Sequence, residues 1–226
     1  MLNDARRIND QGYTTVGRLE FMSTLSPFFT PEEMAQIEAA YFFSKNAHSE
    51  QLRDDGNRYF EHPKTVAWLL ADHFGIHDWR TIVMALLHDM LEDSYIMVPD
   101  RIKKNFGKKV MRGVVVLSKN SFENTIRYDL NGANAAYYRR FETDGTWRET
   151  MVKLVDRIHN LSTMNDMDTE RVSRKLAETE KYFHGLQGLL LTTVPDRHYG
   201  QAEAICQALE EAIENRMLWL SFYASQ

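Results

Sequence analysis

Apolar residues recur every three or four positions through most of this chain, which is the spacing of one face of an α-helix. The clearest stripe is made of Ile82, Val83, Leu86, Leu87, Met90 and Leu91. Another runs through residues 201–222 and comprises Ile205, Leu209, Ile213, Met217 and Leu220. No stretch alternates with a period of two, and there is no repeat and no glycine-rich phosphate loop. The pattern therefore predicts an all-α chain, with residues 1–226 folded as a single domain.

Composition narrows the class of protein without identifying a site. The chain has 226 residues, of which 43% are apolar and 26% are charged, and its formal net charge is −5. An acidic chain is not expected to bind nucleic acid in general. The single cysteine, Cys206, excludes an internal disulfide and fits a reducing compartment. No signal-peptide pattern opens the chain and no apolar run reaches membrane-spanning length, so we expect a soluble, cytoplasmic protein.

Four polar residues stand inside the most apolar stripe. His88, Asp89, Glu92 and Asp93 form two pairs whose members are four positions apart, so each pair would stack on one helix face. Burying three carboxylates and an imidazole in an apolar helix is costly unless a cation or hydrogen bonds compensate them. We therefore interpret this group as a metal site with a reacting side chain. The simpler alternative is that this edge of the helix faces water.

Two other stretches can supply partners for that group. His62 stands at a predicted helix start, and residues 152–161 have helical spacing with Asp156 and Asn160 four apart on one face. Asp156 is a candidate fourth metal ligand, and Asn160 is a candidate hydrogen-bond donor to a substrate. An ordinary salt-bridge face is the alternative, with the partners Lys153 and Arg157. A polar stretch, residues 119–132, is expected to form a loop beside the site.

The order of these residues, His62, then His88 and Asp89, then Asp156, resembles the H…HD…D pattern of HD-domain metal-dependent phosphohydrolases. More narrowly, the chain resembles the hydrolase domain of the RelA/SpoT family, which degrades the alarmone (p)ppGpp. The resemblance runs from about residue 29 to residue 186. It rests on an ordered set of short matches: Ala47-His48, Gln51, Arg53, Gly56, Tyr59, His62-Pro63, Val66-Ala67, Ala85 to Asp89, Glu92-Asp93, Phe106-Gly107, Val110, Ser118-Lys119, Lys153 to Asn160 and Glu178-Thr179. It implies an HD-domain helical bundle, preceded by an N-terminal extension and followed by the helix at 201–222.

The resemblance also implies a chemistry. The two histidines and two aspartates of the pattern would bind Mn²⁺, a cation that suits mixed imidazole and carboxylate ligands. Attack would fall on the 3′-diphosphate of (p)ppGpp and release pyrophosphate and GDP or GTP. Glu92 and Asp93, one turn beyond the ligands, are the candidate catalytic residues that take or orient the proton of the attacking water.

Substrate contacts follow from matches to the same family. Arg53 and Asn160 match positions that hold the nucleoside, and Arg174 is a looser match to a position near the phosphates. Directly after Arg53 the chain departs from the family, because Asp54 and Asp55 stand where a basic or variable residue and a hydroxyl residue are usual. Asp55 could accept the two adjacent donors on the Watson–Crick edge of guanine; alternatively, both acids simply face solvent at a turn.

The sequence is also compatible with two other functions and with a homo-oligomer. The enzyme could cleave another nucleotide, such as an adenosine alarmone or a phosphorylated cofactor, or the fold could sense a nucleotide without turnover. The Glu92-Asp93 pair argues against a mere sensor, because binding alone needs no base. The expected partner is a small-molecule nucleotide, and the stripe at 201–222 is either core or the face of a homo-oligomer.

Overall fold

A computed structural model describes residues 7–93, 99–119, 130–165 and 167–223, without the side chains of residues 92, 93, 130 and 131. Within these ranges the regular structure is helical, and extended backbone pairs only as two isolated bridges, Ile8 with Thr14 and Leu52 with Arg58. The prediction of an all-α fold is confirmed. The loop expected at 119–132 falls largely outside the described residues.

The α-helices follow one another along the chain. They are α1 (Arg18–Leu25), α2 (Pro31–Ala47), α3 (Glu61–Trp68), α4 (Trp79–Leu87), α5 (Met90–Asp93), α6 (Pro99–Leu117), α7 (Leu130–Thr143), α8 (Trp147–Ser162), α9 (Thr169–Thr193) and α10 (Tyr199–Tyr223). α3 continues as a π-helical turn, η3 (Leu69–His73). The 3-10 turns are η2 (Ser26–Phe28) and η5 (Asp196–His198).

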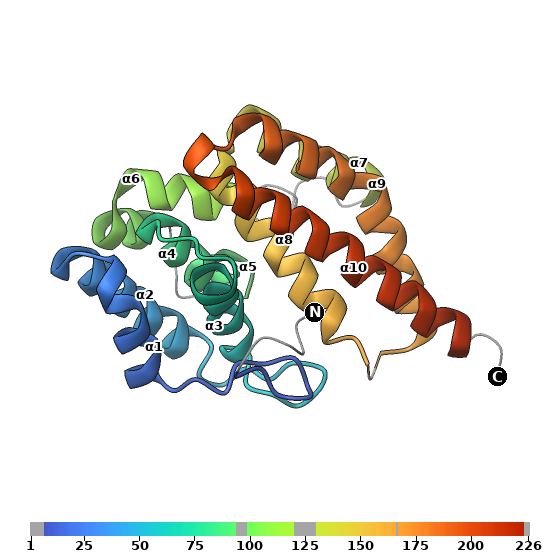
Figure 1. Cartoon of the computed structure of the whole chain (residues 1–226), viewed down its shortest axis with the longest axis horizontal. Helices are drawn as coiled ribbons and strands as arrows, with labels where there is room; N and C mark the ends of the chain where they lie inside the picture. Colours follow the sequence, from blue (N-terminus) through green and yellow to red (C-terminus); the bar gives the residue numbers. More distant parts are fainter. Residues whose placement is uncertain (1–6, 94–98, 120–129, 166, 224–226) are drawn as a thin grey trace.

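Helix α8 is the central element of this arrangement (Figure 1). It packs against α3, α4 and α6 on one side and against α9 and α10 on the other. One apolar cluster extends around it and includes residues from Val16 to Ile213. Asp156 and Arg157 on α8 are each only 4% exposed. Charged side chains on this helix therefore lie inside the molecule, where each needs a compensating partner.

Local sequence signals fix where the two best-capped helices begin. Thr30 caps α2 and Thr146 caps α8, in each case through a capping box completed by a glutamate three residues later, Glu33 and Glu149. Such a box satisfies amide groups that the first turn of a helix leaves without partners. The start of α8, and with it the direction of its polar residues, is set by this local chemistry.

The helix expected to run through residues 82–93 is interrupted. α4 ends at Leu87 and α5 begins at Met90, so His88 and Asp89 form a turn between them. Nδ1 of His88 lies 2.7 Å from the carbonyl oxygen of Ala85, the oxygen that the amide of Asp89 would reach in a regular helix. The imidazole thus replaces a backbone donor, which lets two consecutive side chains face the same space. His88 and Asp89 are therefore not part of one continuous helix with residues 92 and 93.

Helix α10 begins in the core and ends at the surface. Ile205, Leu209 and Ile213 are buried, whereas Met217 is 40% exposed and Leu218 is 68% exposed. Only the first part of the predicted apolar stripe is therefore core. Within the described residues, no helix combines the length and the apolar character needed to cross a membrane.

Candidate active site

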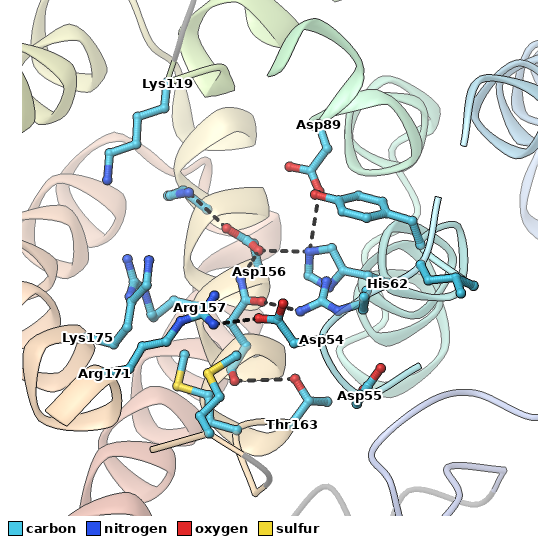
Figure 2. Close-up of a pocket in the computed structure, with 17 residues that line it drawn as sticks. Asp54, Asp55, His62, Asp89, Lys119, Asp156, Arg157, Thr163, Arg171 and Lys175 are labelled. Atoms are coloured by element: carbon cyan, nitrogen blue, oxygen red, sulfur yellow. Dashed lines mark hydrogen bonds and ion pairs between the residues drawn. The ribbon is translucent and has the colours of Figure 1, made fainter. Parts of the chain in front are cut away.

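Four side chains from three separate parts of the chain meet in one cluster. His62 comes from the start of α3, His88 and Asp89 from the turn between α4 and α5, and Asp156 from α8. Nε2 of His62 lies 3.1 Å from Oδ1 of Asp156 and 3.7 Å from Oδ2 of Asp89. Nε2 of His88 lies 3.2 Å from Oδ1 of Asp89 and 3.7 Å from Oδ1 of Asp156. Figure 2 shows His62, Asp89 and Asp156 turned towards one another.

The donor atoms of this cluster fit a divalent cation. One ligand atom from each of His62, His88 and Asp89 lies within 4.8 Å of the others. Ligand atoms bound to one ion at about 2.1 Å are separated by roughly 3 to 4 Å, which is the range of the distances in the cluster. Nε2 of His88 is buried and has no hydrogen-bond partner among the described residues. In the neutral ring the proton lies on Nδ1, which faces a backbone carbonyl as is usual for metal-binding histidines, and the lone pair of Nε2 is left for a metal.

The charges of the cluster also favour a cation. Burial lowers the pKa of His62 to about 4, so this imidazole is neutral at neutral pH. Burial opposes a proton on His88 as well, but Asp89 and Asp156 outweigh it and raise the pKa of His88 to about 9. The imidazoles outweigh burial and lower the pKa of Asp89, and Lys153 lowers that of Asp156 well below its usual range. The carboxylates are thus ionised, and a bound cation would replace the proton on His88.

The expected catalytic pair, Glu92 and Asp93, lies in α5 directly after the cluster. The side chains of both residues fall outside the described part of the structure, so their role stays a prediction. Tyr59, to which the sequence assigned no role, does reach the cluster. Its hydroxyl donates a hydrogen bond to Oδ2 of Asp89 at 3.1 Å.

A cavity of about 360 Å³ lies beside the cluster. Its lining includes Arg53, Asp55 and Asn160, three of the four residues expected to bind substrate. Nη2 of Arg53 donates to Oδ1 of Asn160 at 2.9 Å, and Nδ2 of Asn160 donates to Oδ1 of Asp156 at 2.5 Å. The fourth expected residue, Arg174, is exposed on α9 and is not among the described residues that line this cavity.

The two acidic residues after Arg53 are tied to other parts of the fold. The hydroxyl of Tyr13 donates to Oδ2 of Asp55 at 2.5 Å, and the backbone N–H of Asn57 donates to Oδ1 at 3.0 Å. Asp54 forms an ion pair of 2.7 Å with Arg171 of α9, visible in Figure 2. Asp55 therefore does not simply face solvent, and guanine would compete with Tyr13 for its Oδ2.

Basic side chains from α8, α9 and the end of α6 line the other side of the cavity (Figure 2). They are Lys119, Lys153, Arg157, Arg171 and Lys175. All of these except Lys153 are labelled in Figure 2. The sequence predicts no substrate role for any of these five residues. Its one relevant pattern is helical spacing, because Lys153 precedes Asp156 by three positions. Lys119 and Arg157 also pair with Glu178 at 2.8 and 3.2 Å, and they outweigh burial in lowering its pKa to about 2.

A further histidine lies directly behind the cluster. His159 shares the helical spacing of Val152 and Val155 on α8, and its side chain is fully buried. Its Nδ1 lies 2.8 Å from Nδ1 of His62, and the ring of Tyr13 meets it edge-on at 5.1 Å between ring centroids. His159 thus contacts a cluster residue without facing the cavity.

The fold and the cluster together define the class of protein. The family model of the HD domain matches residues 40–190, a range that contains all four cluster residues. The chain belongs to the HD-domain family.

Particular relatives narrow this family relationship. The chain is 31% identical over 173 residues to the bifunctional (p)ppGpp synthase/hydrolase SpoT of Escherichia coli (strain K12), covering 74% of this chain and 24% of that protein. It is 34% identical over 158 residues to the guanosine-3′,5′-bis(diphosphate) 3′-pyrophosphohydrolase of Aquifex aeolicus (strain VF5), covering 68% and 21%. The chain thus spans a quarter or less of the length of these curated relatives. The resemblance to RelA/SpoT-type hydrolases is confirmed as a sequence relationship.

A solved structure shares the fold. It is described as "A metazoan ortholog of SpoT hydrolyzes ppGpp and plays a role in starvation responses", and the comparison gives a TM-score of 0.61 at 19% identity. The match covers 76% of this chain and 94% of that chain. At this identity the likeness establishes the architecture, in agreement with the HD-domain match.

Proposed function

We propose that this protein is a manganese-dependent hydrolase that removes the 3′-diphosphate of (p)ppGpp, giving pyrophosphate and GDP or GTP. The observation that carries the proposal is the cluster of His62, His88, Asp89 and Asp156 beside a cavity with a basic wall. The names of the relatives, SpoT among them, supply the nucleotide and the reaction.

The four cluster residues would hold the Mn²⁺ ion. Their imidazole and carboxylate donors suit a cation of intermediate softness. When bound, the cation would polarise the attacked phosphoryl group and lower the pKa of the attacking water. Lys153 bonds to Oδ2 of Asp156 at 2.9 Å and so keeps Oδ1 turned towards the imidazoles. Glu92 and Asp93 would take or orient the proton of the water.

The substrate would lie between the cluster and the basic wall. Arg53 and Asn160 would hold the nucleoside, because they border the cavity on the side of α3 and α8. The basic residues Lys119, Arg157 and Lys175 would bind the diphosphates, whose high negative charge they attract and orient. Arg174, on the outer face of α9, would act only through longer-range attraction.

A second candidate substrate is the adenosine counterpart of (p)ppGpp. The observation that favours it is that both carboxylate oxygens of Asp55 already accept hydrogen bonds, one from Tyr13 and one from Asn57. A satisfied carboxylate gains less from the two donors of guanine than a free one would. Asp55 remains our candidate guanine reader, and in that role its Oδ2 would bind the base in competition with Tyr13.

The test is incubation of the purified protein and Mn²⁺ with (p)ppGpp, its adenosine counterpart and a 3′-phosphorylated cofactor. Ion-exchange chromatography should detect pyrophosphate and GDP or GTP in equal amounts. Parallel samples with Mg²⁺, Zn²⁺ or no metal test the choice of cation. Binding of (p)ppGpp without turnover in the presence of Mn²⁺ would instead identify a nucleotide sensor.

We place the protein in the cytoplasm, as a single HD-type unit formed by residues 1–226. A nucleotide substrate and the free thiol of Cys206 both fit a reducing, intracellular compartment. We also propose that the exposed end of α10, where Leu218 and Phe222 are 68% and 65% exposed, is covered in a homo-oligomer. Light scattering after size-exclusion chromatography, repeated with Leu218→Ser, tests the assembly.

A further inference from the structure

His159 is a buried histidine to which the proposed reaction gives no task. It lies on α8, one turn beyond Asp156, and its side chain is 0% exposed. Its Nδ1 approaches Nδ1 of His62 to 2.8 Å, which is a hydrogen-bonding distance. Two imidazole nitrogens this close must share one proton, because two lone pairs or two N–H groups would repel each other. One ring therefore donates and the other accepts.

The other nitrogen of His62 decides which ring donates. Nε2 of His62 faces the cluster, 3.1 Å from Oδ1 of Asp156. A neutral imidazole carries a single proton, and a proton on Nε2 would leave no lone pair there for a cation. Binding of a metal through Nε2 requires the proton of His62 on Nδ1. His159 must then accept that proton through its own Nδ1.

The second imidazole of the cluster supports this assignment independently. Nδ1 of His88 faces the carbonyl oxygen of Ala85 at 2.7 Å, and a carbonyl oxygen can only accept. His88 must therefore carry its proton on Nδ1 whenever it is neutral, with Nε2 free. The two histidines have the same arrangement, in which Nδ1 contacts the protein interior and Nε2 faces the carboxylates. Only the acceptor differs, a backbone carbonyl in one case and His159 in the other.

We propose that His159 is a positioning residue, which accepts the Nδ1 proton of His62 and so holds that ring in the tautomer that binds a cation through Nε2. The proposal rests on the metal-binding part of the proposed function and adds the group that prepares one ligand. Helix α8 would then contribute twice to the metal site. It supplies the ligand Asp156, and one turn later it supplies His159, which orients the ligand His62 of α3.

Two substitutions of similar size separate an acceptor from a packing role. His159→Asn places an amide oxygen close to the position of Nδ1, whereas His159→Leu fills the space without any acceptor. Loss of such support usually weakens metal binding by about 10- to 100-fold. We expect that loss in the leucine variant and Mn²⁺ affinity within a few-fold of wild type in the asparagine variant. His184→Leu, which removes an exposed imidazole from α9, is the matched control.

Mn²⁺ binding is read from the paramagnetic resonance signal of the free ion, without any activity measurement. Wild-type affinity in His159→Leu would overturn the proposal, as would equal losses in both variants when circular dichroism shows an unchanged fold. A second measurement needs no variant: long-range ¹H–¹⁵N spectra of the zinc-loaded wild type should place protons on Nδ1 of His62 and Nε2 of His159. A proton on Nδ1 of His159 would overturn the assignment. A wild type that binds neither metal would contradict the proposed function itself, which is a distinct result.

Discussion

Nη2 of Arg53 donates a hydrogen bond to Oδ1 of Asn160 at 2.9 Å and so joins two residues 107 positions apart in the chain. The amide of Asn160 then donates to Oδ1 of Asp156. A single side chain thus connects the residue expected to hold the nucleoside with a residue expected to hold the metal. We therefore expect nucleotide binding and metal binding to depend on each other.

Replacing Asn160 by alanine tests that connection. The change removes two hydrogen bonds with charged partners, and such bonds contribute about 1.5 to 3 kcal/mol each. KM for (p)ppGpp should rise by about tenfold or more, and Mn²⁺ should bind more weakly. Steady-state kinetics and metal titration measure the two effects. Asn105→Ala, on an exposed position of α6, is the control, and a raised KM with unchanged metal affinity would show that the two sites are independent.

Replacing Asp89 by alanine should remove both the bound metal and the activity. Its carboxylate lies 3.2 Å from His88 and 3.7 Å from His62, so its loss leaves the imidazoles without one of their two anionic neighbours. The helical circular dichroism should persist. Elemental analysis gives the metal content, with Asp100→Ala as a control on α6. Full metal occupancy in the Asp89 variant would refute the assignment of this residue as a ligand.

Glu92→Gln should keep the ion and lower turnover by roughly two to four decades, the usual range for a general base. The expectation follows from the position of Glu92 in α5, just after the cluster and not within it. Single-turnover rates, measured beside the metal content of the same sample, separate the two effects. Unchanged turnover would mean that the water needs no base from this residue.

Asp55 can be tested together with its partner Tyr13. If Asp55 reads guanine, the wild type should prefer (p)ppGpp over its adenosine counterpart, Asp55→Asn should lose most of that preference, and Tyr13→Phe should keep it. If Asp55 instead only anchors the N-terminal segment, Asp55→Asn should leave the nucleotide preference unchanged, and Tyr13→Phe, which removes the hydrogen bond to Asp55, should lower the Tm. Comparing kcat/KM for the two nucleotides with the Tm of each variant distinguishes these roles.

Glu178 should make stability depend on acid. Its pKa falls from 4.5 to about 2 on folding, because Arg157 and Lys119 outweigh burial. A lowered pKa stabilises the folded state above about pH 4.5, and this contribution is lost as the pH falls towards 2. Glu178→Gln should lower the Tm at pH 7 and make the Tm less sensitive to pH between 5 and 3. Glu180→Gln, an exposed neighbour on α9, should leave the acid sensitivity as it is.

The helical architecture could be predicted because apolar spacing is a local feature of the sequence. The four cluster positions could be predicted because they follow a fixed order along the chain. Apolar spacing marks helices, and polar residues inside an apolar stripe, such as His88 and Asp89, mark a site. The structure brings His62 and Asp156 to these two residues, as their order in the chain suggests. Their role as metal ligands stays a prediction until a metal is measured.

Other features of the site depend on contacts between distant residues, which the spacing of residues along the sequence does not show. The break after Leu87 depends on an imidazole replacing a backbone donor, so a continuous apolar pattern hides it. Arg171 and Lys175, four apart on α9, look like an ordinary solvated helix face until the fold places α9 over the cavity. His159 likewise looks like an ordinary core position, because helical spacing does not show its contact with His62. Arg174, which a looser match favoured, turns to the outside of α9.

The turn that carries Arg53, Asp54 and Asp55 is held at three consecutive residues by three different elements: α8, α9 and the N-terminal segment. Only one of these anchors, between Asp54 and Arg171, is well exposed, at 60% and 43%. Added salt should screen this ion pair first and free the turn on the side of α9. Salt would then act in opposite directions on the two halves of a catalytic cycle, slowing the capture of an anionic nucleotide while shortening the residence time of the product.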